Sequence, residues 1–307
     1  MPARARLLDD TSAHRLASGD LEAIFLPRHG MLGASLRHCG AEMLRQIDDL
    51  DQARARGSTA GIPLLHPWAN RLAGLRYSAA GREVALDSKS SLLHLDANGL
   101  PIHGVPWSML AWEVTAAART RLAARLDWTR EDLLAVFPFP HRLEMTVSLA
   151  ADGLTVETTL VADRGHPVPV SFGFHPYFGL PGIARDDWRL SLPAMRRLTL
   201  DARHIPMGAE EVFDGFDAAL GKHDFDDGFA LLDRSASLSL SGGGHRIGME
   251  FIAGYRFAQI YAPKGSDFVA LEPMTAPTNA LKTGRGLRLV EPGASFSAAF
   301  RIRVEAI

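Results

Sequence analysis

Apolar and polar residues alternate with a period of two along much of this chain, and no other feature constrains its fold as strongly. Between residues 121 and 128, leucine, alanine and tryptophan alternate with arginine and aspartate. Residues 143–149, 154–160 and 296–304 repeat the pattern. Because successive side chains of a strand point to opposite faces of a sheet, this alternation is typical of half-buried strands. We therefore expect an all-β protein.

Turn-forming residues separate the alternating segments. The sequence contains 28 glycines and 18 prolines spread along its length, and Ala151-Asp152-Gly153 predicts the turn of a hairpin. Helical periodicity is scarce, although residues 45–56 and 209–219 could form short helical turns. Neither a fixed repeat nor a break in composition divides the chain. These features predict a large antiparallel β-sandwich, folded as a single domain over residues 1–307.

Charge and hydropathy exclude several classes of partner. The formal net charge is -2, and the charged residues of both signs are interspersed, so we expect no binding to nucleic acid or to membranes. No apolar run approaches the roughly 18 residues of a membrane span, and no apolar segment of a signal peptide follows Met1. The single cysteine, Cys39, cannot form an intrachain disulfide. We expect a cytoplasmic protein, and the sequence leaves its oligomeric state open.

Four segments interrupt the alternation and bring polar side chains together. These are residues 62–74, with Trp68, Asn70 and Arg71; residues 100–107, with His103; residues 171–180, with His175; and residues 270–280, with Glu272. Four aromatic residues surround His175 in the sequence. That histidine is therefore either a core residue bonded to a backbone carbonyl or a proton donor whose pKa is tuned by a pocket.

Each of the other candidates also has a purely structural interpretation. Arg71 fits a surface cation, His103 a turn residue, Glu272 a strand-end carboxylate, and Trp68 a core residue. Metal binding is not expected, because the histidines lack short paired ligand spacings. The sequence also lacks the nucleophile-elbow, phosphate-loop and dinucleotide-binding motifs, so no cofactor is predicted.

Taken in order, these motifs resemble one family over most of the chain. Pro-Trp-Ala-Asn-Arg at 67–71, His-Gly at 103–104, His-Pro-Tyr-Phe at 175–178 and Leu-Glu-Pro at 271–273 resemble the aldose 1-epimerase, or galactose mutarotase, family. Residues 225–229 look like the Asp-containing segment of that family, with Asp226 as its carboxylate. The resemblance implies a large antiparallel β-sandwich and a cofactor-independent isomerase. Its substrate would be a monosaccharide or a sugar phosphate, whose α and β anomers it interconverts.

The resemblance also implies roles for individual residues. Glu272 would be the general base that removes the proton from the anomeric hydroxyl, and His175 the general acid that protonates the ring oxygen. His103 would assist at that oxygen or hold the sugar. The remaining roles are hydroxyl binding by Arg71 and Asp226, support of Arg71 or its loop by Asn70, and stacking on the sugar by Trp68 or Phe174. Opening a cyclic hemiacetal needs one acid and one base of near-neutral pKa, and both are present in this set.

Three departures from the family pattern lie beside these motifs. Phe174 precedes His175 where galactose mutarotases commonly have Asn, Met274 follows Glu-Pro where Gln is usual, and His66-Pro67-Trp68 replaces Asn-Pro-Phe. We expect them to change which sugar hydroxyls are recognised. A hexose 6-phosphate is an alternative substrate if Arg45, Arg71 and Arg76 come together.

Two other function classes remain open. A noncatalytic sugar-binding or sensing protein could use the same fold. A glycoside hydrolase is less favoured, because that chemistry usually needs two carboxylates flanking the scissile bond.

Overall fold

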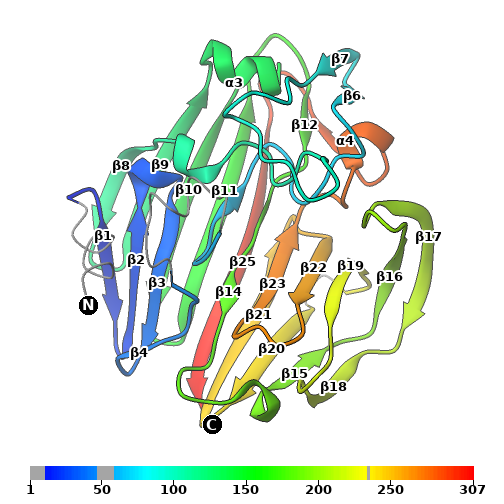
Figure 1. Ribbon diagram of the computed structural model, residues 1–307. Helices are drawn as coiled ribbons and strands as arrows, with labels where there is room; N and C mark the ends of the chain where they lie inside the picture. The colour runs from blue at the N-terminus through cyan, green and yellow to red at the C-terminus, as the bar shows by residue number, and fades with distance from the viewer. Residues whose placement is uncertain (1–10, 47–58, 234–235) are drawn as a thin grey trace.

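The computed structural model describes residues 11–46, 59–233 and 236–307, and most of these residues belong to antiparallel sheets (Figure 1). Two large sheets make up the body of the molecule in this part of the chain, and three small sheets lie beside them. The prediction of an all-β antiparallel sandwich is therefore confirmed.

The larger sheet contains nine strands. In order across the sheet they are β18 (Phe216–Ala219), β15 (Arg189–Leu192), β20 (Ser237–Gly242), β21 (His245–Ala253), β25 (Ser295–Ala306), β11 (Gly153–Ala162), β10 (His141–Ala150), β9 (Arg121–Trp128) and β8 (Glu113–Ala118). The predicted hairpin joins β10 to β11, where Ala150 pairs with Gly153. Buried and partly exposed side chains alternate along β10, as its sequence period requires.

The second sheet contains eight strands and carries most of the predicted site. Its main path runs through β17 (Pro206–Phe213), β16 (Met195–Leu200), β19 (Phe225–Leu231), β22 (Phe257–Ala262), β23 (Val269–Met274), β13 (Gly173–Phe174) and β5 (Leu64–Leu65). The eighth strand, β14 (Tyr177–Phe178), also pairs with β23. All six residues of β23 are buried, so this central strand is covered on both faces.

Short elements surround the two large sheets. Strands β1 (His14–Ser18), β2 (Leu21–Leu26), β3 (Leu32–His38) and β4 (Ala41–Glu42) form one small sheet, β6 (Arg76–Ala79) pairs with β7 (Arg82–Ala85), and β12 (Val168–Val170) pairs with β24 (Arg288–Val290). The helices among the described residues are α3 (Glu131–Val136) and α4 (Ala280–Thr283), with the 3-10 turns η1 (Pro27–His29), η2 (Trp107–Met109) and η3 (Arg185–Asp187). No helix in the described ranges is long and apolar enough to cross a membrane.

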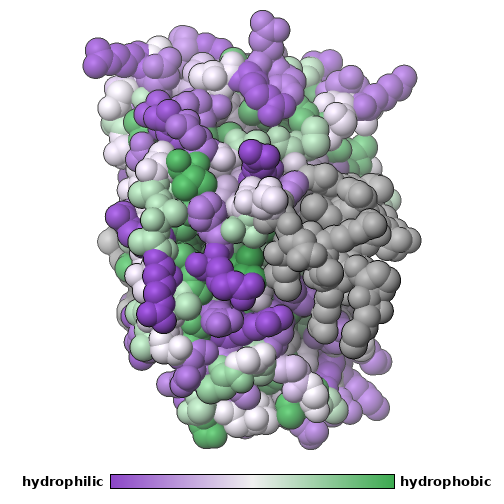
Figure 2. Space-filling view, turned by 90° about the vertical axis from the view of Figure 1, so that its left-hand side faces the viewer, coloured by the Kyte–Doolittle hydropathy of each residue, from purple (hydrophilic) through white to green (hydrophobic). Residues whose placement is uncertain are grey.

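The hydrophobic core fills the space between the two large sheets. Phe174 of β13 and Phe300 of β25 belong to different sheets, and their ring centroids lie 5.0 Å apart. Burying a side chain of this size contributes about 1.5–3 kcal/mol to folding. By contrast, the outer face at the left of Figure 1 is mainly hydrophilic, and its described hydrophobic residues form only small groups (Figure 2).

The predicted helical turns are not found where the structure describes the chain. Residues 209–219 form the end of β17 and all of β18. β17 lies at the edge of its sheet, paired only with β16, so most of its side chains are exposed to solvent without any need for helical periodicity. Most of the other expected segment, 45–56, lies outside the described residues.

Candidate active site

A cavity of about 340 Å³ opens on the eight-stranded sheet. It is lined by Arg45, Thr59, Asn70, Arg71, His94, Asp96, Ile102, His103, His175, Tyr177, Asp226, Gln259, Tyr261, Phe268 and Glu272. The fold thus brings together six of the seven residues predicted from the sequence, from five separate segments. The seventh, Trp68, does not line the cavity.

Glu272 and His175 form the centre of this site. Glu272 belongs to the central strand β23, and His175 lies in the bend between β13 and β14, which both pair with β23. His175 Nε2 lies 3.1 Å from Glu272 Oε1. The second carboxylate oxygen, Oε2, is buried and has no hydrogen-bond partner among the described residues. One oxygen of the carboxylate therefore contacts the histidine, and the other is free to accept a proton.

Burial governs the protonation of this pair. Glu272 is 1% exposed and His175 4% exposed. Desolvation raises the pKa of Glu272, with repulsion by Asp226 in the same direction and attraction by Arg71 opposing both. Desolvation, followed by the effect of His103, lowers the pKa of His175. Both shifts disfavour an ion pair between Glu272 and His175. They favour the neutral carboxylic acid beside the neutral imidazole, with one proton available between Nε2 and Oε1.

His103 reaches the cavity through a strained loop. Its φ is +65°, and its backbone N–H donates to the carbonyl of Asn70 at 2.9 Å. A Cβ at the next residue, Gly104, would lie 2.3 Å from the carbonyl oxygen of His66, so this loop needs glycine there. Desolvation, and then electrostatic interactions with Arg71 and His94, lower the pKa of His103 to about 3. The His103 ring is therefore neutral at physiological pH and can exchange hydrogen bonds with a hydroxyl.

Arg71 is held in place by two neighbours. Its Nε donates to Asp96 Oδ2 at 2.8 Å, and its Nη1 donates to Asn70 Oδ1 at 3.2 Å. Asn70 therefore contacts Arg71, as predicted, and also lines the cavity itself. A guanidinium fixed in this way keeps its remaining N–H donors aimed in one direction, which suits the binding of a polar ligand.

Asp226 belongs to a polar group that sequence reasoning only partly identified. Gln259 Nε2 donates to Asp226 Oδ1 at 2.6 Å, and His204 Nδ1 lies 3.2 Å from Asp226 Oδ2. Gln259 also pairs directly with Glu272 across β22 and β23. Gln259 is a polar residue within an otherwise largely apolar strand, and this feature could have identified it as a candidate site residue. Its position opposite Glu272 depends on strand pairing, which the sequence does not specify.

Aromatic rings form part of the cavity wall, but they are not the rings that the sequence suggested. Tyr177 stacks on His175 with ring centroids 4.1 Å apart and an interplanar angle of 12°, and its hydroxyl contacts His175 Nε2 at 3.2 Å and Thr59 Oγ1. Tyr261 and Phe268 also line the cavity. Among the aromatic residues predicted or observed, Tyr177, Tyr261 and Phe268 are therefore the ones placed to contact a ligand in the cavity.

Trp68 and Phe174 instead face the core. Each is 1% exposed, and neither lines the cavity. Trp68 packs with its ring centroid 6.3 Å from that of Tyr77. Phe174 directly precedes His175, and neighbouring residues of an extended chain point to opposite faces. The predicted stacking roles of Trp68 and Phe174 are therefore not supported by their positions.

The other two departures from the family pattern are also buried away from the cavity. Met274 packs in a small apolar cluster with Leu65 and Ala69, and His66 Nε2 contacts His141 Nε2 at 3.0 Å. Neither residue lines the site. The expectation that they alter recognition of sugar hydroxyls therefore loses its structural basis.

The three arginines considered for a sugar phosphate do not all line the cavity. Arg45 and Arg71 line the cavity, whereas Arg76 is an exposed residue of β6 that does not. Arg45 lies over the ring of Phe268, with its Cζ 4.7 Å from the ring centroid. Within the described part of the chain, no group of three or more histidine, cysteine, aspartate or glutamate side chains is placed to hold a metal ion.

Comparisons with known proteins bear on the fold and the family of this chain. An uncharacterized protein of Escherichia coli strain K12, YphB, is 28% identical over 257 residues, covering 80% of this chain and 83% of the relative. A galactose mutarotase-like protein from Clostridium acetobutylicum has the same fold, with a TM-score of 0.83, 19% identity and 95% of each chain covered. Galactose 1-epimerase from Lactobacillus acidophilus NCFM matches with a TM-score of 0.74, 16% identity and coverage of 94% of this chain and 92% of that one. The family model for aldose 1-epimerase matches residues 16–303, and the chain therefore belongs to the aldose 1-epimerase family.

Proposed function

We propose that this protein is a cofactor-independent mutarotase that interconverts the α and β anomers of an aldose. The observation that carries the proposal is the pair formed by Glu272 and His175, 3.1 Å apart, with Glu272 Oε2 buried and unpartnered in a cavity of about 340 Å³. A volume of this size lies within the roughly 300–1,000 Å³ that is typical of small-molecule sites.

Ring opening requires two proton movements at neighbouring oxygens. Glu272 Oε2 takes the proton of the anomeric hydroxyl, and His175 Nε2 gives a proton to the ring oxygen. The bond between C1 and the ring oxygen breaks while O1 becomes a carbonyl. Rotation about the bond from C1 to C2 and closure on the other face of the carbonyl give the second anomer, and the protons return. No electron leaves the sugar and no group is lost, so the chemistry needs no cofactor.

The directions of the two pKa shifts are compatible with this mechanism. Moving the shared proton onto His175 Nε2 creates the carboxylate and the imidazolium together. A sugar hydroxyl that donates to Oε2 favours the carboxylate, and the nearby charge of Arg71 acts in the same direction. The raised pKa of Glu272 also makes it a stronger base than a carboxylate in water. His103, as a neutral ring, assists at the ring oxygen or holds a hydroxyl.

The substrate is either a free monosaccharide or a sugar phosphate. Arg71, Asn70, Asp226 and Gln259 supply donors and acceptors for hydroxyl groups. Arg45 has no carboxylate partner in the described part of the chain, and its guanidinium is exposed at the cavity wall. It is the residue best placed to meet a phosphate. The cytoplasmic location and the absence of nucleic-acid and membrane partners stay predictions.

The test is catalysed anomer exchange. Polarimetry and saturation-transfer NMR on a panel of free aldoses and their 6-phosphates should show faster equilibration with the wild-type protein than with Glu272→Gln, which keeps the shape of the side chain but removes its basicity. Circular dichroism would check that both proteins are folded. Equal rates for both proteins on every sugar would refute the proposal, and saturable sugar binding without exchange would instead identify a binding or sensing protein.

A further inference from the structure

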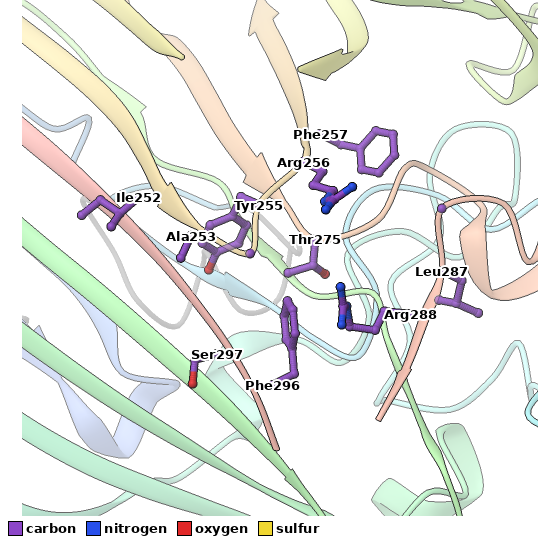
Figure 3. Close-up of a pocket in the computed structure, with 12 residues that line it drawn as sticks. Ile252, Ala253, Tyr255, Arg256, Phe257, Thr275, Leu287, Arg288, Phe296 and Ser297 are labelled. Carbon is purple, nitrogen blue, oxygen red and sulfur yellow. The ribbon is translucent and has the colours of Figure 1, made fainter. Parts of the chain in front are cut away.

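A second and larger cavity, of about 620 Å³, lies where β21 crosses over to β22 between the two large sheets (Figure 3). It is lined by Ile252, Ala253, Gly254, Tyr255, Arg256, Phe257, Thr275, Gly286, Leu287, Arg288, Phe296 and Ser297. None of these residues lines the candidate active site. The reaction proposed above therefore makes no use of this cavity.

Two arginines give this cavity a positive charge. Arg256 lies in the connection between β21 and β22, and Arg288 begins β24. Neither forms an ion pair with a carboxylate in the described ranges, and no acidic residue is among those lining the cavity. Figure 3 shows both guanidinium groups directed to the part of the cavity where Thr275 lies. Two unpaired guanidinium groups facing one space favour an anion there.

The backbone holds both arginines at this place. The N–H of Arg256 donates to the carbonyl of Met274, and the carbonyl of Arg256 accepts from Leu231. On the other side, a Cβ at Gly286 would lie 2.9 Å from the ring of Phe257. Only glycine lets the chain pass this close to the Phe257 ring on its way to Arg288. The backbone on the Arg256 side and on the Arg288 side of the cavity is therefore held by the fold.

Aromatic side chains complete the walls. The Cζ of Arg288 lies 5.1 Å from the centroid of the Phe296 ring, and Tyr255 and Phe257 also line the cavity. When a guanidinium stacks on an aromatic ring, its planar face contacts the ring and the N–H groups at its edge can still donate hydrogen bonds. The cavity therefore combines donors for an anion with apolar surface for the molecule that carries it.

We propose that this cavity binds a small molecule that carries a phosphate or carboxylate group on an aromatic or other planar body. Paired guanidinium donors recognise the oxygens of either anion, and the rings of Phe257 and Phe296 contact the planar body. A small molecule is favoured over a protein partner, because a cavity of this volume encloses a ligand of that size. This site is separate from the mutarotase site and does not depend on the function proposed above.

The test uses phenyl phosphate as the probe, titrated into the whole protein and followed by isothermal calorimetry and ¹H–¹⁵N NMR. We expect saturable binding that the Arg256→Gln/Arg288→Gln double variant weakens by about tenfold or more, and that inorganic phosphate reproduces more weakly. Arg76→Gln is the matched control, since it removes an exposed arginine from outside the cavity. Benzoate tests the other anion, and tighter binding of benzoate would assign the site to a carboxylate.

A second control separates this cavity from the candidate active site. Arg45 could also meet a phosphate, so Arg45→Gln should leave phenyl phosphate binding unchanged if the probe occupies the second cavity. The proposal is overturned if none of the three probes binds saturably up to about 10 mM. It is equally overturned if Arg45→Gln abolishes the binding and the double variant, folded by circular dichroism, does not.

Discussion

His66 and His175 both precede proline and are both buried, yet they occupy different chemical environments. His66 is 1% exposed, and its ring contacts Trp128 with centroids 4.8 Å apart. Its Nε2 lies 3.0 Å from His141 Nε2, and His141 Nδ1 contacts the carbonyl of Phe139 at 2.6 Å. His175 instead faces a cavity and contacts the carboxylate of Glu272.

Burial shifts the pKa of both histidines in the same direction. Desolvation, followed by the electrostatic interaction with the neighbouring His141, lowers the pKa of His66, and desolvation also lowers that of His175. A perturbed pKa therefore does not separate the two residues. What separates them is an open cavity and a carboxylate partner with a free oxygen, because proton transfer requires access for the substrate as well as a suitable acid and base.

The largest predicted effect tests whether His175, unlike His66, takes part in catalysis. We expect His175→Gln to lower kcat/KM for anomer exchange by about 10²–10⁴-fold, since general acid catalysis contributes on that scale. The free energy of unfolding should change by no more than about 1 kcal/mol. Exchange kinetics and urea denaturation measure the two quantities. Exchange within tenfold of the wild-type rate would show that His175 is no more catalytic than His66.

The opposite result is expected for His66. His66→Ala removes a packed core side chain and should cost about 2–4 kcal/mol of unfolding free energy. At a temperature where the variant is folded, kcat/KM should stay within about threefold of wild type, because the ring does not line the cavity. Loss of exchange in a folded His66→Ala protein would mean that this core pair acts on the site.

The buried histidine pair should also make the protein sensitive to acid. Burial lowers the pKa of His141 to about 4, while in the unfolded chain a histidine titrates near 6.5. Between those values the unfolded state binds a proton that the folded state does not. The stability contributed by the neutral ring is thus complete above about pH 6.5 and is lost as the pH falls toward 4.

His141→Gln measures this contribution. As the pH falls from 6 to 5, the free energy of unfolding should decrease less steeply for the variant than for wild type. The two slopes should differ by about 1.4 kcal/mol per pH unit. Denaturant titrations at several pH values give the slopes, and His166→Gln, at an exposed histidine, is the control. Equal slopes for the wild-type and His141→Gln proteins would contradict the burial argument.

The smallest effect is expected for Phe174, which is adjacent to His175 in sequence but faces the core. Phe174→Leu should change the KM for the sugar by less than about twofold and cost about 1 kcal/mol of stability. Gln259→Leu, on the cavity side, should raise KM by about tenfold or more, because it leaves Asp226 Oδ1 without its donor. A larger KM change for Phe174→Leu than for Gln259→Leu would reverse the assignment of the two faces.

Most of the fold and part of the site could be predicted from the sequence. The period-two alternation identified strands such as β10 and β25, because the two faces of a sheet meet different environments. It failed at residues 209–219, which belong to the edge strands β17 and β18, where most side chains are at least partly exposed and the alternation is weak. The ordered motifs identified Arg71, His103, His175, Asp226 and Glu272, whose chemistry is visible from residue type.

The tertiary structure decided which side chains share a cavity. Trp68, Phe174 and Met274 lie within two residues of site residues in the chain, but the fold buries them outside the cavity. Gln259, Tyr261 and Asp96 are distant in sequence, and strand pairing and loop packing bring them to Glu272 and Arg71. The sequence by itself determined the sheet-forming pattern and the acid and base residue types. Only the packed structure decided the neighbours of Glu272 and His175 and the directions in which their pKa values shift, because burial and distance depend on how the strands come together.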